Sequence, residues 1–426
     1  MSVLGIIEKL LDGFEVEWKK FDDVGVFLRG KRFVKADMKS EGVPCIHYGE
    51  MYTHFGVHAK EAKSFLDESV ASKLRVANPG DVVIVAAGET IEDIGNGTAW
   101  LGESDIVFHD ACFSFKSSLD PKYVSYYLRT NLFKEQIRRS VSSGKISSIN
   151  AKGLGKATIP IPCPDNPEKS LAIQAEIVRI LDAFTAMTAE LTAELNMRKK
   201  QYNYYRDQLL SFEEGDVEWK NLEDVASFRR GSFPQPYGNS EWYDGEGCMP
   251  FVQVADVADF GFTLHQTTKQ KISKLAQPKS VFVEKGTVVV SLQGTIGRVA
   301  ITQYDSYVDR TLAIFTSYKE DINKKYFAHQ LKAKFDLEKE FARGSTLKTI
   351  TKQEFSKFQI PIPPIEEQNR IVALLDKFDT LTHSIKEGLP REIELRQKQY
   401  EYYRDLLLSF PASPAGGPKS HSDEAA

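Results

Sequence analysis

Basic residues beside serine, threonine and glycine are the side chains whose chemistry this sequence indicates most directly. Two such stretches occur, at residues 142–150 (SSGKISSIN) and 343–351 (RGSTLKTIT). Hydroxyls, backbone amides and long basic side chains are the groups that contact phosphates, and Lys and Arg also reach base edges. The candidate contacts in and just after these stretches are Lys145, Lys152, Arg343, Lys348 and Lys352.

A second basic cluster lies near the start of each half of the chain. Its candidate residues are Arg29, Lys31 and Arg32 in the first half, and Arg229 and Arg230 in the second. A loop that follows in the second half adds Gln235, Tyr237 and Asn239, which are suited to reading base edges. One charged run is usually only a solvated face. Its occurrence at corresponding places in both halves favours contact with nucleic acid.

The motifs of several enzyme classes are absent from the sequence. It has no Asp-Pro-Pro-Tyr or Asn-Pro-Pro-Tyr segment, no GxxxxGK[ST] loop and no HExxH motif, and its eight histidines are scattered. We therefore predict no catalytic residue, no cofactor and no metal site. The four cysteines are far apart and no apolar run has membrane length, which favours a reduced, cytoplasmic chain without membrane contact. A net charge of −4 excludes coating of DNA by bulk positive charge.

The elements that must position these residues occur twice. Three segments recur in the same order: VEWK at 16–19 and 217–220, IPIP at 159–162 and 360–363, and a thirteen-residue segment at 200–212 (KQYNYYRDQLLSF) and 398–410 (KQYEYYRDLLLSF). Eleven of the thirteen positions in the last pair are identical. An internal repeat of this kind predicts a molecule with pseudo-twofold symmetry. The alternative is a duplication without a symmetric role.

Each IPIP segment is followed by a ladder of apolar and aromatic residues at steps of three and four, from Ile173 to Leu209 and from Ile371 to Leu407. This spacing predicts two coiled-coil helices, each about 60 Å long. Since so long a helix needs a partner surface, we expect the two to pair antiparallel. The alternative is that each packs on its own globular part. Gly388 and Pro390 predict a kink in the second helix.

The Tyr-Tyr-Arg-Asp segment that closes each ladder has two open interpretations: it docks a partner protein, or it only solvates the helix. The candidate partner-docking residues are Tyr204, Arg206, Asp207, Tyr402, Arg404 and Asp405.

Short β-rich runs and polar loops fill the sequence between the matched edges. Examples are residues 81–85 (DVVIV) and 287–290 (TVVV), and short helices are expected at 121–130 and 324–334. The predicted fold class is α+β, with two globular domains separated by two long antiparallel coiled-coil helices in a pseudo-twofold internal repeat. The predicted boundaries are 15–158 (block 1) and 213–359 (block 2) for the domains, 159–212 and 360–410 for the spacer helices, and 411–426 for a disordered tail.

Residues 360–379 (IPIPPIEEQNRIVALLDKFD) and 396–410 (RQKQYEYYRDLLLSF) resemble the conserved regions of type I restriction–modification specificity subunits. The resemblance extends over residues 16–410. The first copy departs from it, because residues 165–175 are about seven residues longer and no counterpart matches Glu366 and Glu367 at the same spacing.

This resemblance implies a non-catalytic subunit with two target-recognition domains, one for each half of a bipartite DNA site. It also implies three kinds of partner: double-stranded DNA, two methyltransferase subunits, and restriction or translocase subunits bound through the complex. Two alternatives come from other classes, a DNA methyltransferase enzyme and a helical scaffold that binds only proteins. The absent motifs disfavour the first, and the repeated basic clusters disfavour the second.

Overall fold

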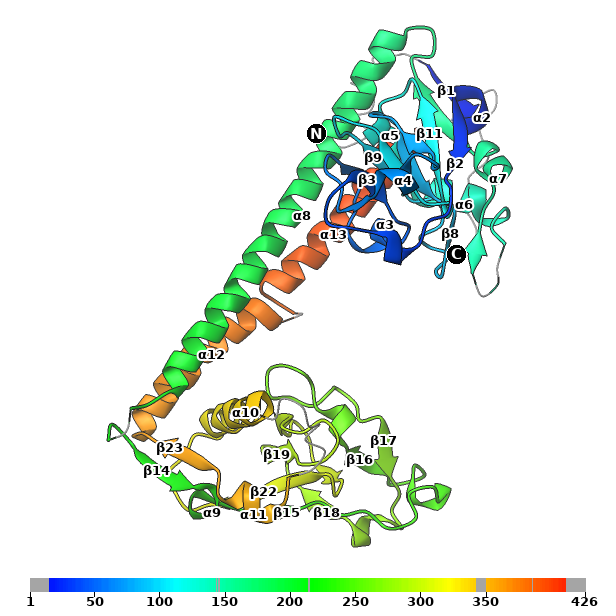
Figure 1. Cartoon of the computed structure of the whole chain (residues 1–426). Coiled ribbons are helices and arrows are strands. Elements are labelled where there is room, and N and C mark those ends of the chain that lie inside the picture. Colours follow the sequence, from blue (N-terminus) through cyan, green and yellow to red (C-terminus); the bar gives the residue numbers. More distant parts are fainter. Residues whose placement is uncertain are drawn as a thin grey trace. The chain divides into compact units, whose positions relative to one another are not determined.

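The computed structural model describes residues 15–142, 144, 146–213, 215–341, 350–384 and 386–410 of the chain, with backbone only at 339–341. These residues form two compact units. Unit 1 consists of Met1–Ala189 and Leu395–Ala426, and unit 2 consists of Glu190–Glu394. Both boundaries fall inside helices, so each unit contains one block together with parts of the long helices (Figure 1). The predicted tail at 411–426 lies outside the described residues.

Block 1 is built on a five-stranded sheet of order β2-β11-β7-β9-β4 and a four-stranded sheet of order β5-β3-β10-β6. The strands are β1 (Val16–Lys20), β2 (Gly25–Arg29), β3 (Val43–Ile46), β4 (His58–Ala59), β5 (Ser64–Leu66), β6 (Val76–Ala77), β7 (Val82–Val85), β8 (Ala87–Gly88), β9 (Gly97–Trp100), β10 (Ile106–Phe108), β11 (Cys112–Ser117), β12 (Ser147–Ser148) and β13 (Thr158–Pro162). The helices are α2 (Phe21–Val24), α3 (Glu50–Thr53), α4 (Glu68–Ala71), α5 (Pro121–Tyr127), α6 (Asn131–Arg138) and α7 (Ala151–Gly155), with a 3-10 turn η1 (Lys35–Asp37).

Block 2 repeats this plan with two four-stranded sheets, β15-β22-β19-β20 and β17-β16-β21-β18. Its strands are β14 (Glu218–Asn221), β15 (Ala226–Arg230), β16 (Met249–Val252), β17 (Gln270–Ile272), β18 (Val281–Val283), β19 (Val288–Ser291), β20 (Val299–Ile301), β21 (Ser306–Val308), β22 (Leu312–Tyr318) and β23 (Gln359–Ile362). Its helices are α9 (Leu222–Val225), α10 (Lys324–Phe341) and α11 (Lys352–Ser356), with 3-10 turns η2 (Ser240–Trp242), η3 (Val254–Asp256) and η4 (Gln277–Lys279).

The sequence repeat is a structural repeat at the edge of each block. Strand β1 pairs antiparallel with β13 and places Trp18 opposite Pro160, while β14 pairs with β23 and places Trp219 opposite Pro361. A buried tyrosine closes both pairs from the inside. Tyr123 donates its hydroxyl hydrogen bond to the Pro160 carbonyl at 2.9 Å, and Tyr326 donates to that of Pro361 at 3.0 Å. Each block is therefore clasped where its chain enters and leaves.

The predicted helix pair is present in both units. The first ladder is one continuous helix, α8 (Pro167–Leu210), of about 66 Å at 1.5 Å per residue. In unit 1, Phe184 stacks on Tyr403 with ring centroids 5.1 Å apart, and in unit 2, Tyr205 stacks on Phe378 at 5.7 Å. Since the partners run backward as α8 runs forward, the pairing is antiparallel. The predicted fold class is confirmed.

The second ladder differs from the prediction of one kinked helix. It consists of two helices, α12 (Ile365–His383) and α13 (Leu389–Leu407). Gly388 lies in the left-handed region at φ +84°, and a Cβ there would approach the Thr380 carbonyl oxygen at 2.4 Å. A residue with this backbone cannot lie inside a right-handed helix, and Gly388 directly precedes the first residue of α13. Pro390 is tolerated because it lies in the first turn of α13.

Candidate nucleic-acid and partner interfaces

The repeated Arg-Gly step follows the first sheet strand of each block. Arg29 ends β2 and Arg230 ends β15. The next residue passes so close to another loop that a Cβ on Gly30 would lie 2.2 Å from the His109 carbonyl oxygen, and one on Gly231 would lie 2.2 Å from that of Val308. Only glycine fits there. The close approach fixes where the preceding arginine leaves the sheet.

In block 2 the two predicted basic clusters meet, although 120 residues separate them in sequence. Arg230 donates a hydrogen bond to the Ile350 carbonyl at 3.1 Å, at the start of the segment that leads into α11. The Lys352 ammonium at the first turn of α11 lies 5.9 Å from the centre of the Phe228 ring, on the same strand as Arg230. Arg229 and Lys352 are exposed and Arg230 is half-buried. This surface is therefore basic and partly preorganised.

In block 1 two of the candidate basic residues, Arg29 and Lys31, donate to carbonyl groups rather than to carboxylates. Arg29 donates to the Asp110 carbonyl at 3.0 Å and Lys31 to that of Lys73 at 2.8 Å. Arg32 is exposed beside them, and Lys152 is exposed on α7. Main-chain carbonyls orient these cations and leave their charge available to an incoming phosphate.

In the loop that contains Gln235, Tyr237 and Asn239, two of these side chains make contacts within block 2. The Tyr237 hydroxyl donates to Asp309, and its ring stacks on Phe233 at 4.9 Å. The Asn239 side chain accepts from the Glu241 amide at 3.1 Å and so caps η2. Gln235 precedes both residues and is exposed. The contacts of Tyr237 and Asn239 fix part of this loop, and Gln235 stays accessible on its surface.

Three of the predicted phosphate contacts, Lys145, Arg343 and Lys348, lie outside the described residues. Lys134 belongs to the basic run of residues 134–156, yet its side chain turns inward. Its ammonium donates to the Ile94 carbonyl at 2.7 Å. Sequence reasoning also missed Arg129, which is half-buried nearby; neither residue has a local pattern that marks it as turned inward.

The Tyr-Tyr-Arg-Asp segments divide their residues between the core and the surface. Tyr202 and Tyr400 are buried, whereas Tyr204 and Tyr402 are 59% and 64% exposed. In each segment the arginine pairs with the adjacent aspartate, Arg206 with Asp207 at 2.6 Å and Arg404 with Asp405 at 2.8 Å. Arg206 is half-buried and Arg404 is buried. The exposed tyrosines are therefore the side chains best placed to touch a partner.

Within the described ranges, no group of three or more His, Cys, Asp and Glu side chains is arranged to hold a metal ion. In the same part of the chain, every helix is too short or too polar to cross a membrane.

Comparison with known proteins identifies the repeat. A family model described as the type I restriction modification DNA specificity domain matches residues 15–198 and again 214–395. The specificity subunit of the Escherichia coli type I restriction enzyme EcoR124I/EcoR124II is 38% identical, over 96% of this chain and 98% of that protein. The putative specificity subunit S.HindORF215P of Haemophilus influenzae is 32% identical, over 95% and 98%.

A solved structure shares the fold at low sequence identity. It was reported under a title on complex assembly and conformational transition of the type I R-M system, and it superposes with a TM-score of 0.66 at 17% identity, over 92% of this chain and 97% of that one. Each matched copy covers one block and part of the helical segment that follows it. The chain therefore belongs to the type I restriction–modification DNA specificity family, as a specificity subunit and not a methyltransferase.

Proposed function

We propose that each block reads one half of a divided DNA sequence, and that the chain directs methyltransferase and restriction subunits to the sites it selects. The observation that carries this proposal is that the two blocks share the same pair of edge strands but differ in the segments between those strands. The clasps β1–β13 and β14–β23 have the same register, while the loops between them differ in length and side chains. The E. coli relative, a specificity subunit of a type I restriction enzyme, supports the same role.

The candidate DNA contacts in the described residues are those that remain exposed or half-buried on the block surfaces. They are Arg29, Lys31, Arg32, Lys152, Arg229, Arg230, Gln235, Tyr237, Asn239 and Lys352. Lys145, Arg343 and Lys348 complete the set on sequence grounds. For the domains we keep the boundaries 15–158 and 213–359, with spacer helices at 159–212 and 360–410.

Two methyltransferase subunits are the proposed partners, because Tyr204 and Tyr402 present the same exposed side chain at matching positions of the repeat. Matching surfaces on a pseudo-twofold molecule bind two copies of one partner. Tyr204, Arg206, Asp207 and their counterparts Tyr402, Arg404 and Asp405 remain the docking candidates. Restriction subunits join through that complex, and a role on chromosomal DNA favours the cytoplasm.

Reconstitution tests the proposed function. The purified chain, mixed with DNA and a labelled methyl donor, is expected to transfer no methyl group, because recognition and chemistry reside in different subunits. Adding the methyltransferase subunit of its own system is expected to produce methylation at one bipartite sequence, mapped by sequencing. The methyltransferase subunit without the chain serves as the control. Methyl transfer by the chain alone would contradict the proposal.

A charge variant tests the DNA surface. Lys152→Ala and Lys352→Ala are each expected to weaken binding to all sequences alike and to reduce the slope of log K against log salt by about one. If either lysine touches a base edge instead, one position of the site loses about 1–3 kcal/mol of discrimination. Lys200→Ala, an exposed lysine on α8, is the matched control. Unchanged affinity and slope in both variants would move the DNA surface elsewhere.

A further inference from the structure

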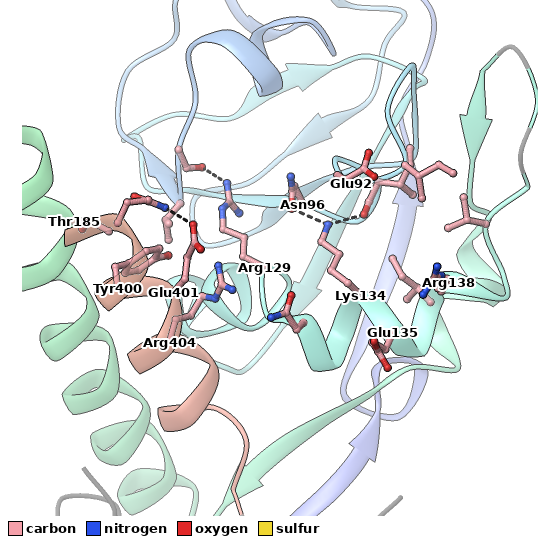
Figure 2. Close-up of a pocket in the computed structure, with 18 of the residues that line it drawn as sticks. Glu92, Asn96, Arg129, Lys134, Glu135, Arg138, Thr185, Tyr400, Glu401 and Arg404 are labelled. Atoms are coloured by element: carbon pink, nitrogen blue, oxygen red, sulfur yellow. Dashed lines mark hydrogen bonds between the residues drawn. The ribbon is translucent and has the colours of Figure 1, made fainter. Parts of the chain in front are cut away.

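Unit 1 contains a pocket that the proposed function does not use. Its volume is about 1130 Å³, and it lies between the segment Gly56–His58, helix α6 and helix α13. Figure 2 shows that Arg129 and Lys134 enter it from the α5–α6 region and Arg404 from α13. These three cationic side chains share one recess with the exposed Arg138, and such an arrangement costs free energy unless negative charge balances it.

Among the described residues, the Arg129 guanidinium forms no ion pair with the carboxylates that line this pocket. Its guanidinium donates to the Gly56 carbonyl at 2.9 Å and also to the Gly97 carbonyl. Among the residues that the structure describes, no ion pair joins Arg129 to Asp or Glu. Carbonyl groups orient the guanidinium and leave its full charge uncompensated.

Lys134, like Arg129, donates its hydrogen bonds to uncharged groups. Its ammonium donates to the Ile94 carbonyl at 2.7 Å and to the Asn96 side-chain oxygen at 2.8 Å, and both partners are neutral. Burial, with the nearby charge of Arg129 as the next cause, lowers the pKa of Lys134 to about 7. The positive charges of Arg129 and Lys134 therefore repel one another.

The remaining charges of the pocket do not neutralise this pair. Arg404 is bonded to Asp405, whose second oxygen accepts from Asn131 at 2.7 Å. The glutamates that line the pocket are all exposed: Glu92, Glu135 and Glu401. Arg138 is also exposed, whereas Arg129 and Lys134 are half-buried and Arg404 is buried.

Unit 2 offers a control within the same chain, because the one cation there that corresponds to a cation of the unit 1 pocket has an acid. Lys332 follows the clasp tyrosine Tyr326 by six residues, as Arg129 follows Tyr123. It pairs with Asp336 at 2.6 Å, whereas the residue at that position in unit 1 is Phe133. Arg298 occupies the place of Asn96 and pairs with Asp259 at 2.6 Å.

In unit 2 the acid Asp259 lies in a short loop segment of the same chain that also contains an aromatic side chain. Asp259 precedes Phe260, whose ring stacks on His383 of α12 at 4.2 Å. The backbone position matches that of the segment at 54–57 in unit 1, since Ile301 donates to the Phe262 carbonyl as Ala99 donates to that of Val57. Unit 1 has His54 where unit 2 has Asp259, and Asn96 where unit 2 has Arg298, so neither member of that ion pair is present in the unit 1 pocket.

We propose that the unit 1 pocket binds a carboxylate supplied in trans, on a partner peptide segment in which an acidic residue adjoins an apolar one. Arg129 and Lys134 receive the carboxylate, and apolar wall residues such as Val57 and Ile94 receive the neighbouring side chain. The proposal goes beyond the proposed function, because it requires no particular partner subunit.

A peptide suits this pocket better than duplex DNA does. Arg404 is only 8% exposed, and the Arg129 guanidinium is held by carbonyls of Gly56 and Gly97 inside the recess. The phosphates of a duplex lie on a wide, stiff rod that cannot enter such a recess, whereas one acidic side chain can. In unit 2 an Asp-Phe segment already lines the corresponding pocket, where Asp259 pairs with Arg298.

Competitive acylation of the full chain tests the proposal through Lys134. At pH 7.5 this amine is expected to react at least about tenfold faster than exposed Lys152, as measured by mass spectrometry, because more of it is unprotonated. The probe is the acetylated and amidated peptide Ala-Asp-Phe-Gly-Phe, copied from residues 258–262. Saturating peptide is expected to slow labelling of Lys134 about tenfold. The same peptide with asparagine for aspartate is expected to have no effect.

Two variants make the result specific. Asn96→Asp places a carboxylate at hydrogen-bond distance from Lys134, so it is expected to slow labelling without peptide and to weaken peptide binding at least tenfold. Lys134→Leu introduces the residue type of the corresponding position, Leu337, and is expected to abolish binding measured by fluorescence anisotropy. Lys332→Leu in unit 2 is the matched control and is expected to leave binding unchanged. Thermal unfolding verifies that each variant is folded.

Three results would overturn the proposal. The first is labelling of Lys134 no faster than that of Lys152. The second is equal protection by the aspartate and asparagine peptides. The third is protection by a DNA duplex and not by the peptide, which would assign the pocket to phosphate.

Discussion

Replacing residues 16–158 with the corresponding block of another specificity subunit is expected to change one half of the recognised sequence and to leave the other half as it was. The physical reason is the clasp. Block 1 begins and ends on the paired strands β1 and β13, and its own sheets and core lie between them. An exchange at these strands therefore preserves the register of the entry and exit of the chain.

The effect is measured by mapping methylated sites in the reconstituted complex. At about 1–3 kcal/mol for each wrong base pair, a changed half-site reduces methylation of the parental sequence at least about 100-fold. The reciprocal exchange of residues 216–359 is the matched control and should change only the other half. If either exchange altered both halves together, the two blocks would not be independent readers.

Insertion of four residues between Leu191 and Leu195 is expected to lengthen the gap between the two half-sites by one or two base pairs. Helix α8 is continuous across the boundary between the units, and four residues add about 6 Å to it. This length corresponds to roughly two base pairs of DNA. Four residues also keep the apolar stripe nearly in phase, so the helix can still pair.

The measurement is methylation of synthetic sites that share both half-sites and differ only in the gap. The variant is expected to lose at least about tenfold in activity on the parental gap and to recover it on the longer one. A two-residue insertion is the matched control. At 100° per residue it turns the apolar stripe away from its partner and should lower activity on every gap. An active four-residue variant with an unchanged gap would show that α8 does not set the spacing.

The repeated edges and the helix ladders could be predicted because they are encoded locally. The IPIP strands, the aromatic ladder and the two-block organisation depend on neighbours in sequence or on direct comparison of the halves. The sheet orders could not be predicted in this way. Strand β3, for example, pairs parallel with β10 some sixty residues later, and nothing in Val43–Ile46 indicates that partner. The break at Gly388 was expected as a kink because the left-handed backbone conformation is not visible in the sequence.

The candidate site was predictable to a similar depth. Arg29 and Arg230 followed from the basic cluster near the start of each half, and the structure adds the close approach of Gly30 and Gly231 that explains the glycine after each arginine. The inward orientation of Lys134 could not be predicted, because charge alone does not tell which side of α6 faces the interior. That side is determined by Phe133 and Ile137, which are buried in the block 1 core.

Unit 1 is built from two segments that are far apart in the sequence, and this has a consequence for biosynthesis. Asn131 and Asp405 are joined by a 2.7 Å hydrogen bond across 274 residues, and Tyr126 lies 6.3 Å from Tyr400, ring centre to ring centre. At about 5–20 residues per second, the ribosome adds the second member of such a pair roughly 15–55 s after the first. Block 1 therefore emerges first but waits for α13, whereas every part of unit 2 has been translated before Leu395. During that interval the nascent chain displays an uncovered aromatic face, on which a chaperone or an already assembled subunit can act before release from the ribosome.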